Sequence, residues 1–453
     1  MRWPPTLLSW TALAALASLL LAPGAAAGAV ETPIDADGEA FLCATPEDHY
    51  ETLDPLAKRA ALPSITKVYS GKSIAVVVKI AFSNAAYTVA DSTLNKTHAS
   101  VNSLFRSMSR STFEFDFKVH PEIWTAPGTK EEYSADFSSL QSFIASKLRE
   151  NGYTKISSSN PNGNYTVFVA NFPRIGVNWA GLSNGSSGGG NYINGSYSSG
   201  VTAHELGHAV GLPHAHSIEA GSDAFGTPGT SSQHVEYGNP YDVMGNAGGL
   251  GHFNVNYKWR TGWIDKEEAL EVKSSGVYRI YAHDNPVHKG RMLGIRVSSM
   301  DTRYAYWFEY RAANTYARAG AEVLFEGFQG ITSRSIHILD MTPASRANSD
   351  AQDAVLAVGK EFKDKYGSAT FRTLAINSGT WSENGWVDLQ VTLPGSELVT
   401  LGRPASLPRP SAGTGADLDI LGRTLGAALP AQALVVKSGR VGLSLSREAA
   451  LAP

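Results

Sequence analysis

The sequence predicts an α+β fold: a mixed sheet with packed helices, one of them rich in histidine, followed by a β-sandwich-like C-terminal domain. Three observations predict it. Between residues 73 and 172, strand-like and helix-like apolar spacing alternate, an order typical of helices packed on a sheet. A helix-compatible run that contains histidines follows at residues 201–211. From about residue 272 the pattern changes to short alternating segments with little helical signal.

The elements of the N-terminal half follow from their apolar spacing. We expect strand, helix, strand, helix and strand at residues 73–82, 91–109, 113–119, 137–148 and 165–172. Asp91 or Ser92 is the expected N-terminal cap of the first helix, because short polar side chains accept hydrogen bonds from the free N–H groups there. Residues 181–200 are rich in Gly, Ser and Asn, so we expect a loop that leads into the histidine-containing helix.

The C-terminal half is predicted to be mostly β-structure. Alternating segments occur at residues 277–281, 304–310 and 386–393. Beyond Pro394 the chain is rich in Pro, Gly, Ala and Leu without clear periodicity, which is typical of a poorly ordered tail. The expected boundaries are therefore a domain with the histidine-containing helix at 63–268, a β-rich domain at 269–394 and a low-complexity tail at 395–453.

The N-terminus has the pattern of a secretory signal peptide over residues 1–27. A positive start, an apolar stretch at 7–21 and a run of small residues at its end suit signal peptidase cleavage. The apolar stretch is short for a membrane span, and we expect a secreted protein, extracellular or in the cell wall, with no membrane segment after cleavage. Residues 28–62 are interpreted as a propeptide. Processing after the dibasic pair at 58–59 is a hypothesis, and an ordinary exposed pair is the alternative.

Composition excludes some partners and modifications. The formal net charge is −3, from 38 Lys+Arg and 41 Asp+Glu, and without a basic stripe nothing indicates a nucleic-acid partner. The chain has 1 Cys, so no intramolecular disulfide can form. Glycosylation sequons, which fit an extracytoplasmic route, begin at Asn95, Asn164, Asn184 and Asn194.

The most informative segment is HELGHAVGLPH at residues 204–214. On a helix, residues four apart share a face, so His204 and His208 can present two imidazoles to one ion. Gly211 can adopt positive φ and end the helix, which allows His214 to approach from another direction. Three histidines with one open position are the donor set of a catalytic zinc ion.

Glu205 lies beside the first histidine but points away from the shared face, which suits a base acting on water better than a further ligand. Zinc would lower the pKa of its water and polarise a scissile carbonyl. Glu205 would take the proton and pass it to the leaving amine. The alternative is a helix whose histidines only fill the core, and the full spacing of the motif disfavours it.

This pattern resembles the signature of metzincin metalloproteases, which also carry a methionine-containing turn beneath the metal. Met244 is the candidate for that turn. Within this clan the chain is most similar to the gametolysin family of secreted peptidases, through residues 242–245, 252–263 and 306–311. Ala215 follows the third histidine, where astacins carry Glu, adamalysins Asp and serralysins Pro. No tyrosine stands two places after the methionine, so an astacin-like tyrosine ligand is not expected.

The resemblance covers roughly residues 72–393 and implies a metzincin-type catalytic domain at 63–268. It also implies a secreted zinc endopeptidase whose protein substrates are extracellular-matrix or cell-wall glycoproteins, often rich in proline or hydroxyproline. Acidic loops leave room for Ca²⁺, but no calcium-loop spacing supports it. The sequence carries no signal for the oligomeric state.

Cys43 allows two interpretations. A propeptide thiolate can occupy the fourth zinc position and hold a protease latent, in a zymogen. The position of Cys43 before the dibasic pair favours this role as a latency thiol. Residues 42–48 lack the arginine and the glycine of the matrixin switch motif, which favours an incidental free thiol.

Other functions and residues remain alternatives. One alternative function is a secreted adhesion or binding protein with a structural or vestigial zinc site, although such a site has no use for Glu205. A second alternative function is zinc-dependent hydrolysis of a non-peptide bond. Asp242 is expected to fix the turn by local hydrogen bonds. His216, His234 and His252 are expected to be solvated loop residues. Tyr237 and Tyr241 could support an oxyanion, but packing beside the methionine-containing turn is favoured, and all five residues are left out of the site.

Overall fold

The computed structural model describes residues 43, 65, 67–225, 234–246, 250–284, 289–299, 304–315, 317–327, 335–345, 350–364, 369–379 and 384–395. All of them belong to one compact unit, Met1–Ala405. The expected signal peptide at 1–27, the dibasic pair at 58–59 and the tail beyond residue 395 lie outside the described residues, as does the expected propeptide apart from Cys43.

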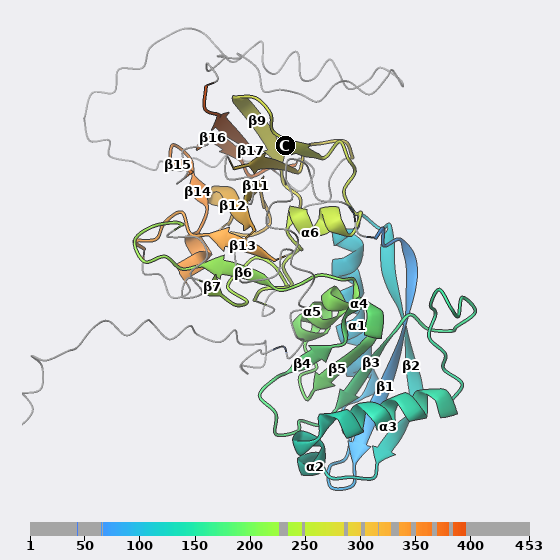
Figure 1. Ribbon diagram of the computed structural model, residues 1–453. Helices are drawn as coiled ribbons and strands as arrows, with labels where there is room; N and C mark the ends of the chain where they lie inside the picture. The colour runs from blue at the N-terminus through green and yellow to red at the C-terminus, as the bar shows by residue number, and fades with distance from the viewer. Residues whose placement is uncertain are drawn as a thin grey trace, which may run out of the picture. The chain divides into compact units, whose positions relative to one another are not determined.

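The first half of the chain is built on a five-stranded sheet with the order β2-β1-β3-β5-β4 (Figure 1). The strands are β1 (Gly71–Phe82), β2 (Phe113–Ala126), β3 (Val167–Phe172), β4 (Gly181–Ser183) and β5 (Gly190–Asn194). Neighbouring strands are parallel except at the edge, where β4 runs antiparallel to β5. The sheet therefore ends on a short antiparallel edge strand.

Helices cover both faces of this sheet. The helices α1 (Asp91–Met108) and α5 (Ser199–Ala209) share one core with Ala75 and Val77 of β1. On the other face, α2 (Lys130–Ala135) and α3 (Phe137–Glu150) share a second core with Val76 and Val78. Burial on both faces explains why the sequence of β1 is a nearly continuous apolar run rather than an alternating one.

The second half contains two further sheets. One has the order β7-β6-β13-β12-β11-β10-β8, with β14 paired to β12, and the other has the order β15-β16-β17-β9. The strands are β6 (Ala215–Ile218), β7 (His234–Val235), β8 (Ala269–Glu271), β9 (Gly276–Tyr281), β10 (Gly294–Ser298), β11 (Ala305–Glu309), β12 (Gly320–Glu326), β13 (Ile336–Leu339), β14 (Leu356–Ala357), β15 (Glu361–Lys363), β16 (Thr370–Asn377) and β17 (Trp386–Thr392). The other described helices are the short α4 (Gly185–Gly188) and α6 (Val255–Arg260) and the 3₁₀ helices η2 (Ala317–Ala319) and η3 (Asp350–Asp353).

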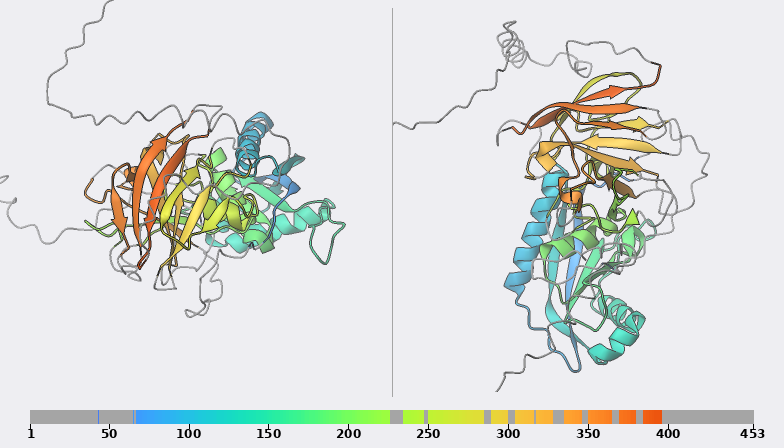
Figure 2. Two further views of the ribbon diagram at one scale, coloured as in Figure 1. Left: turned by 90° about the horizontal axis from the view of Figure 1, so that it is seen from above. Right: turned by 90° about the vertical axis from the view of Figure 1, so that its left-hand side faces the viewer.

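Aromatic side chains join these two sheets. Tyr306 and Phe308 of β11 lie with ring centroids 5.6 and 4.5 Å from that of Phe371 in β16. Figure 2 shows the two sheets as neighbouring layers. The fold is thus a mixed α/β arrangement with several sheets and few helices, which confirms the predicted class at this level.

The boundary expected between residues 268 and 269 is crossed by strand pairing. β6 and β7 precede it in sequence, yet β6 pairs in parallel with β13, with His216 opposite His337. The backbone N–H of Val255 also donates to the buried Glu309 carboxylate across the same boundary, with 2.6 Å between N and Oε2. Both halves therefore contribute to one continuous core.

Two local expectations were wrong. Residues 181–200 are not a loop but contain β4, α4 and β5. The polar residues in β5 are buried because their amides find partners, as when Asn191 Nδ2 donates to Phe168 O at 3.0 Å. The N-cap of α1 is Ala90 and makes no side-chain cap bond, while Asp91 accepts instead from Lys79 Nζ at 2.9 Å.

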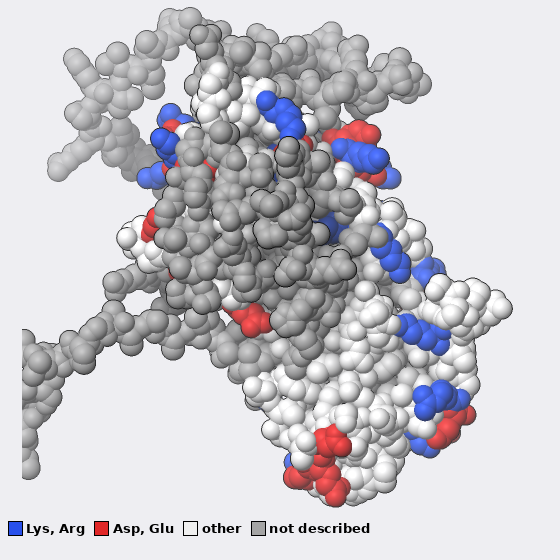
Figure 3. All heavy atoms as spheres, viewed as in Figure 1, with Lys and Arg blue, Asp and Glu red and all other residues white. Residues whose placement is uncertain are grey.

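The face drawn in Figure 3 shows no large charged stripe among the described residues. On the face drawn in Figure 3, the visible Lys, Arg, Asp and Glu side chains are scattered in small groups. Among the described residues, no helix is both long enough and apolar enough to cross a membrane.

Candidate metal centre

The helix α5 carries the first part of the histidine motif and has defined ends. Ser198 caps its start, where its side chain accepts from Val201 N at 3.1 Å. At its end Gly211 has φ +82°, and its N–H donates to His208 O at 2.8 Å while Leu212 N donates to Gly207 O at 3.1 Å. This pair of bonds is a Schellman motif, and only the left-handed glycine allows it without strain. The chain consequently turns back toward the helix, as the sequence predicted.

The three histidines are oriented by acceptors on their Nδ1 atoms. His204 Nδ1 lies 2.7 Å from Val243 O, and His208 Nδ1 lies 2.8 Å from Leu212 O. His214 Nδ1 lies 3.1 Å from the Glu236 carboxylate. Carbonyl or carboxylate partners on Nδ1 are typical of metal-binding imidazoles, since they fix the tautomer that directs Nε2 to the metal.

The contact between two of these rings favours a cation. A carbonyl oxygen only accepts hydrogen bonds, so Nδ1 of His204 and of His208 carries the proton. In neutral rings both Nε2 atoms then bear a lone pair, and they lie 3.2 Å apart. Protonation of His204 is disfavoured, because burial, and then the neighbouring His208 and His214, lower its pKa well below the ordinary value. A metal ion between the nitrogens removes the repulsion.

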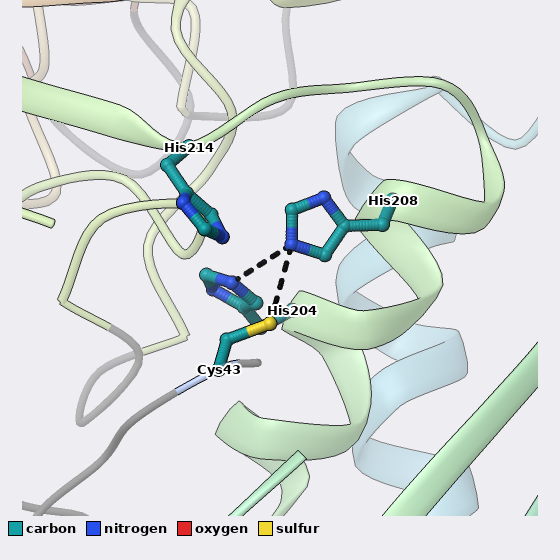
Figure 4. Close-up of side chains that lie close together, drawn as sticks. All are labelled: Cys43, His204, His208 and His214. Carbon is teal, nitrogen blue, oxygen red and sulfur yellow. Dashed lines mark hydrogen bonds between the residues drawn. The ribbon is translucent and has the colours of Figure 1, made fainter. Parts of the chain in front are cut away.

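Cys43 brings a sulfur atom to the same group. Its Sγ lies 3.5 Å from His208 Nε2 and donates to Glu205 Oε2 at 3.3 Å. Figure 4 shows the four side chains pointing toward one another, and their donor atoms all lie within 4.8 Å of each other. These four residues could hold a metal ion, and the buried Glu205 carboxylate lies directly beside them.

The backbone of Cys43 contacts two other elements of the site. It forms a parallel bridge with Gly181 of the edge strand β4. Its carbonyl oxygen accepts from the Tyr237 hydroxyl at 2.8 Å. Cys43 therefore lies against the edge strand β4, next to His208 and Glu205.

Met244 lies directly against α5. It is fully buried, and a Cβ added to Gly207 would overlap its Sδ atom. Asp242 fixes the turn that carries it, as expected: Oδ1 accepts from Met244 N at 2.8 Å and Oδ2 accepts from Asn254 N at 2.7 Å. The Val243 carbonyl that orients His204 belongs to this same turn.

The second half of the chain holds the turn in place. The buried Arg311 guanidinium donates from Nη1 to Tyr241 O at 3.1 Å and to His252 O at 2.7 Å. The same side chain is paired with Glu309 and Glu322. Local sequence patterns do not predict this role for Arg311, because its two carbonyl partners lie 70 and 59 residues before it in the chain.

The histidines expected to be solvated have other environments. His216 is fully buried, with ring centroids 4.4 Å from His234 and 4.9 Å from His337. His252 Nδ1 lies 3.0 Å from Lys258 Nζ. The expectation of solvation was wrong for His216, because β6 places it between β7 and β13 inside a sheet.

The predicted sequons differ in accessibility. Asn95, Asn164 and Asn184 are exposed. Asn194 is buried; its Nδ2 donates to Trp179 O at 2.7 Å, and its Oδ1 accepts from Ile175 N at 2.8 Å. A glycan on this nitrogen is incompatible with the fold, so the prediction of Asn194 as a glycosylation site is withdrawn.

No family model matches the chain, and no curated protein matches it. The function must therefore be argued from the geometry of the site.

Proposed function

We propose that this chain is a secreted, zinc-dependent endopeptidase of the metzincin type, similar to gametolysins. One observation carries the proposal: three imidazoles with anchored Nδ1 atoms converge beside the buried Glu205. Glu205 lies on α5 together with two of the three histidines, His204 and His208. Imidazole nitrogens suit Zn²⁺, and three of them leave one position for chemistry. The position of Met244 beneath α5 supports the assignment to metzincins.

His204, His208 and His214 would hold the metal ion. When bound, zinc supplies a Lewis acid that lowers the pKa of water and polarises a carbonyl group. Glu205 takes a proton from the attacking water molecule as the oxygen of that water bonds to the peptide carbonyl carbon. The same carboxyl then gives the proton to the amine nitrogen as the C–N bond breaks.

The edge strand β4 supports a peptide as the substrate. An extended chain can add to an exposed sheet edge through main-chain hydrogen bonds. Cys43, in the segment interpreted as the propeptide, already forms a bridge with Gly181 of β4, next to Glu205. We infer that a substrate peptide takes the place of this segment, and that extracellular or cell-wall glycoproteins are the substrate class, as the resemblance to gametolysins implies.

We further propose that the full-length chain is latent. Zinc sites with four protein donors are closed, whereas catalytic sites keep one position open. Cys43 makes the donor set four, and its removal leaves the three histidines. A thiolate is a strong zinc ligand, so the proform would be inactive until the segment that carries Cys43 leaves the site.

Hydrolysis of casein tests the peptidase directly. We would compare the wild type with Glu205→Gln, each after brief trypsin treatment and at matched zinc content. Loss of the general base should lower kcat by at least about 10²-fold, and a zinc chelator should abolish the wild-type activity. Equal activity in both proteins would remove Glu205 from the mechanism. Bound zinc without hydrolysis in either protein would favour a structural zinc site in an adhesion protein.

Latency is tested by Cys43→Ser in the untreated full-length chain. Because a hydroxyl is a much weaker zinc ligand than a thiolate, this variant should cleave casein without trypsin, while the wild type should not. N-ethylmaleimide should activate the wild type and leave Cys43→Ser unchanged, since no other cysteine exists. A Cys43→Ser proform as silent as the wild-type proform would contradict latency, provided that trypsin activates both.

A further inference from the structure

Tyr237 brings a hydroxyl group to the metal centre that neither the ligand set nor the general base explains. Its ring centroid lies 4.3 Å from that of His214 and 6.0 Å from that of His204. The hydroxyl donates to the carbonyl oxygen of Cys43 at 2.8 Å. Packing against histidine rings requires only the aromatic ring, so the hydrogen bond is a separate feature.

The backbone holds this side chain in an unusual conformation. Tyr237 has φ +59°, in the left-handed region that bulky residues rarely adopt. It lies in a turn closed by Gly238 N, which donates to Val235 O at 3.2 Å. Glu236, in the same turn, accepts from His214 Nδ1. One turn therefore positions a ligand histidine and aims the hydroxyl, and such backbone strain is typical of functional sites.

The acceptor of this hydrogen bond indicates what the hydroxyl binds. The Cys43 carbonyl belongs to a residue that forms a parallel bridge with Gly181 of β4, and the sulfur of the same residue lies among the histidines. A peptide carbonyl oxygen beside the metal ligands and Glu205 is thus within reach of Tyr237. When the segment leaves, the hydroxyl faces the space that a substrate peptide would enter.

We propose that Tyr237 is a catalytic residue that donates a hydrogen bond to the oxygen of the scissile carbonyl; this rests on the proposed peptidase function. As the water oxygen bonds to the carbonyl carbon, the π electron pair moves onto the carbonyl oxygen, and Glu205 holds the proton of the water. Tyr237 stabilises the charged oxygen without losing its own proton. When the electron pair returns, the C–N bond breaks and the amine nitrogen takes the proton from Glu205.

The test compares Tyr237→Phe with Tyr241→Phe, both trypsin-treated and at matched zinc content. Tyr241 is a matched control because it is also buried near the turn, but its hydroxyl donates to Gln352 O at 2.5 Å rather than toward the histidines. Loss of one preorganised donor should lower kcat by about 10²–10³-fold in Tyr237→Phe, with KM changed less than about threefold. Tyr241→Phe should keep the wild-type kcat.

A second readout does not depend on turnover. Calorimetric binding of an alanine-based phosphinic peptide, whose tetrahedral phosphorus carries charged oxygens, should weaken at least about tenfold in Tyr237→Phe and stay unchanged in Tyr241→Phe. Wild-type kcat in Tyr237→Phe, or equal affinity of wild type and Tyr237→Phe for the phosphinic peptide, would overturn the proposal. If the wild type cleaves no peptide at all, the peptidase function fails, and the binding comparison alone decides the role of Tyr237.

Discussion

Individual side chains set how closely the motif helix approaches the turn beneath it. A Cβ atom at position 207 would overlap Met244 Sδ and lie 3.2 Å from Met244 Cε and 3.3 Å from Phe253 Cζ. Protein cores are packed densely, so one added methyl group forces its neighbours to move. Gly207 is therefore required by close approach and not by backbone conformation.

Replacement of Gly207 by alanine should destabilise the protein. Overpacking costs about 1–3 kcal/mol, while the better helix propensity of alanine returns about 1 kcal/mol. We expect Gly207→Ala to have a lower free energy of unfolding in urea than Gly276→Ala, a matched control whose added Cβ would lie 3.6 Å from the Tyr278 ring. Equal stability of the two variants would show that α5 and Met244 are not in contact.

For individual residues, the sequence predicts which residues form the metal centre better than it predicts the groups that orient their side chains. His204, His208 and Glu205 share a helix, and Gly211 returns the chain to His214, so local spacing is sufficient. The groups that accept hydrogen bonds from the histidine Nδ1 atoms, in contrast, lie far away in the sequence. Glu236 lies 22 residues beyond its histidine, and the Val243 carbonyl lies 39 residues beyond. Such pairs depend on how the later turns fold back, which local spacing does not encode.

Among the elements, those with strong periodicity were predicted and those with polar composition were missed. The strand β1 and the helices α1 and α3 were expected within a few residues of their bounds, because each buries a long apolar pattern. β4 has three residues and β5 five, in a segment rich in Gly, Ser and Asn. Their burial depends on hydrogen bonds to neighbouring strands, which composition does not reveal.

The strand β6 illustrates the same limit for domain boundaries. It begins directly after His214 and pairs in parallel with β13, whose first residue is Ile336. A pairing between two strands that lie more than a hundred residues apart in the sequence cannot be inferred from either strand alone. The sequence therefore predicted a boundary at 268, although the chain that leaves the metal motif joins the sheet of the second half.

For the whole molecule, Arg311 links the second half of the chain to the turn of the metal centre. Its guanidinium is buried, donates to two backbone carbonyls that flank the Met244 turn, and is paired with Glu309 and Glu322. Removal of one partner from a buried ionic group leaves charges without compensation, which is far more costly than removal of an exposed pair.

Arg311→Met should lower the free energy of unfolding by about 3–5 kcal/mol. Arg279→Met is the matched control, since Arg279 pairs with Asp388 at 2.8 Å but keeps 22 % of its side chain exposed; a cost of about 1 kcal/mol is expected there. Urea unfolding with fluorescence measures both. A similar loss in the two variants would contradict the role of Arg311 as a link between the halves.

The zinc content of purified full-length protein tests the metal centre most directly. The wild type should bind about one equivalent of zinc, and His208→Ala, which removes one donor, should bind far less after dialysis. His98→Ala is the matched control, because His98 is also buried but stacks on Phe117, with ring centroids 4.3 Å apart. It should retain the wild-type zinc content. Absence of zinc from the wild type, or full zinc content in His208→Ala, would contradict the assignment of these histidines to a metal centre.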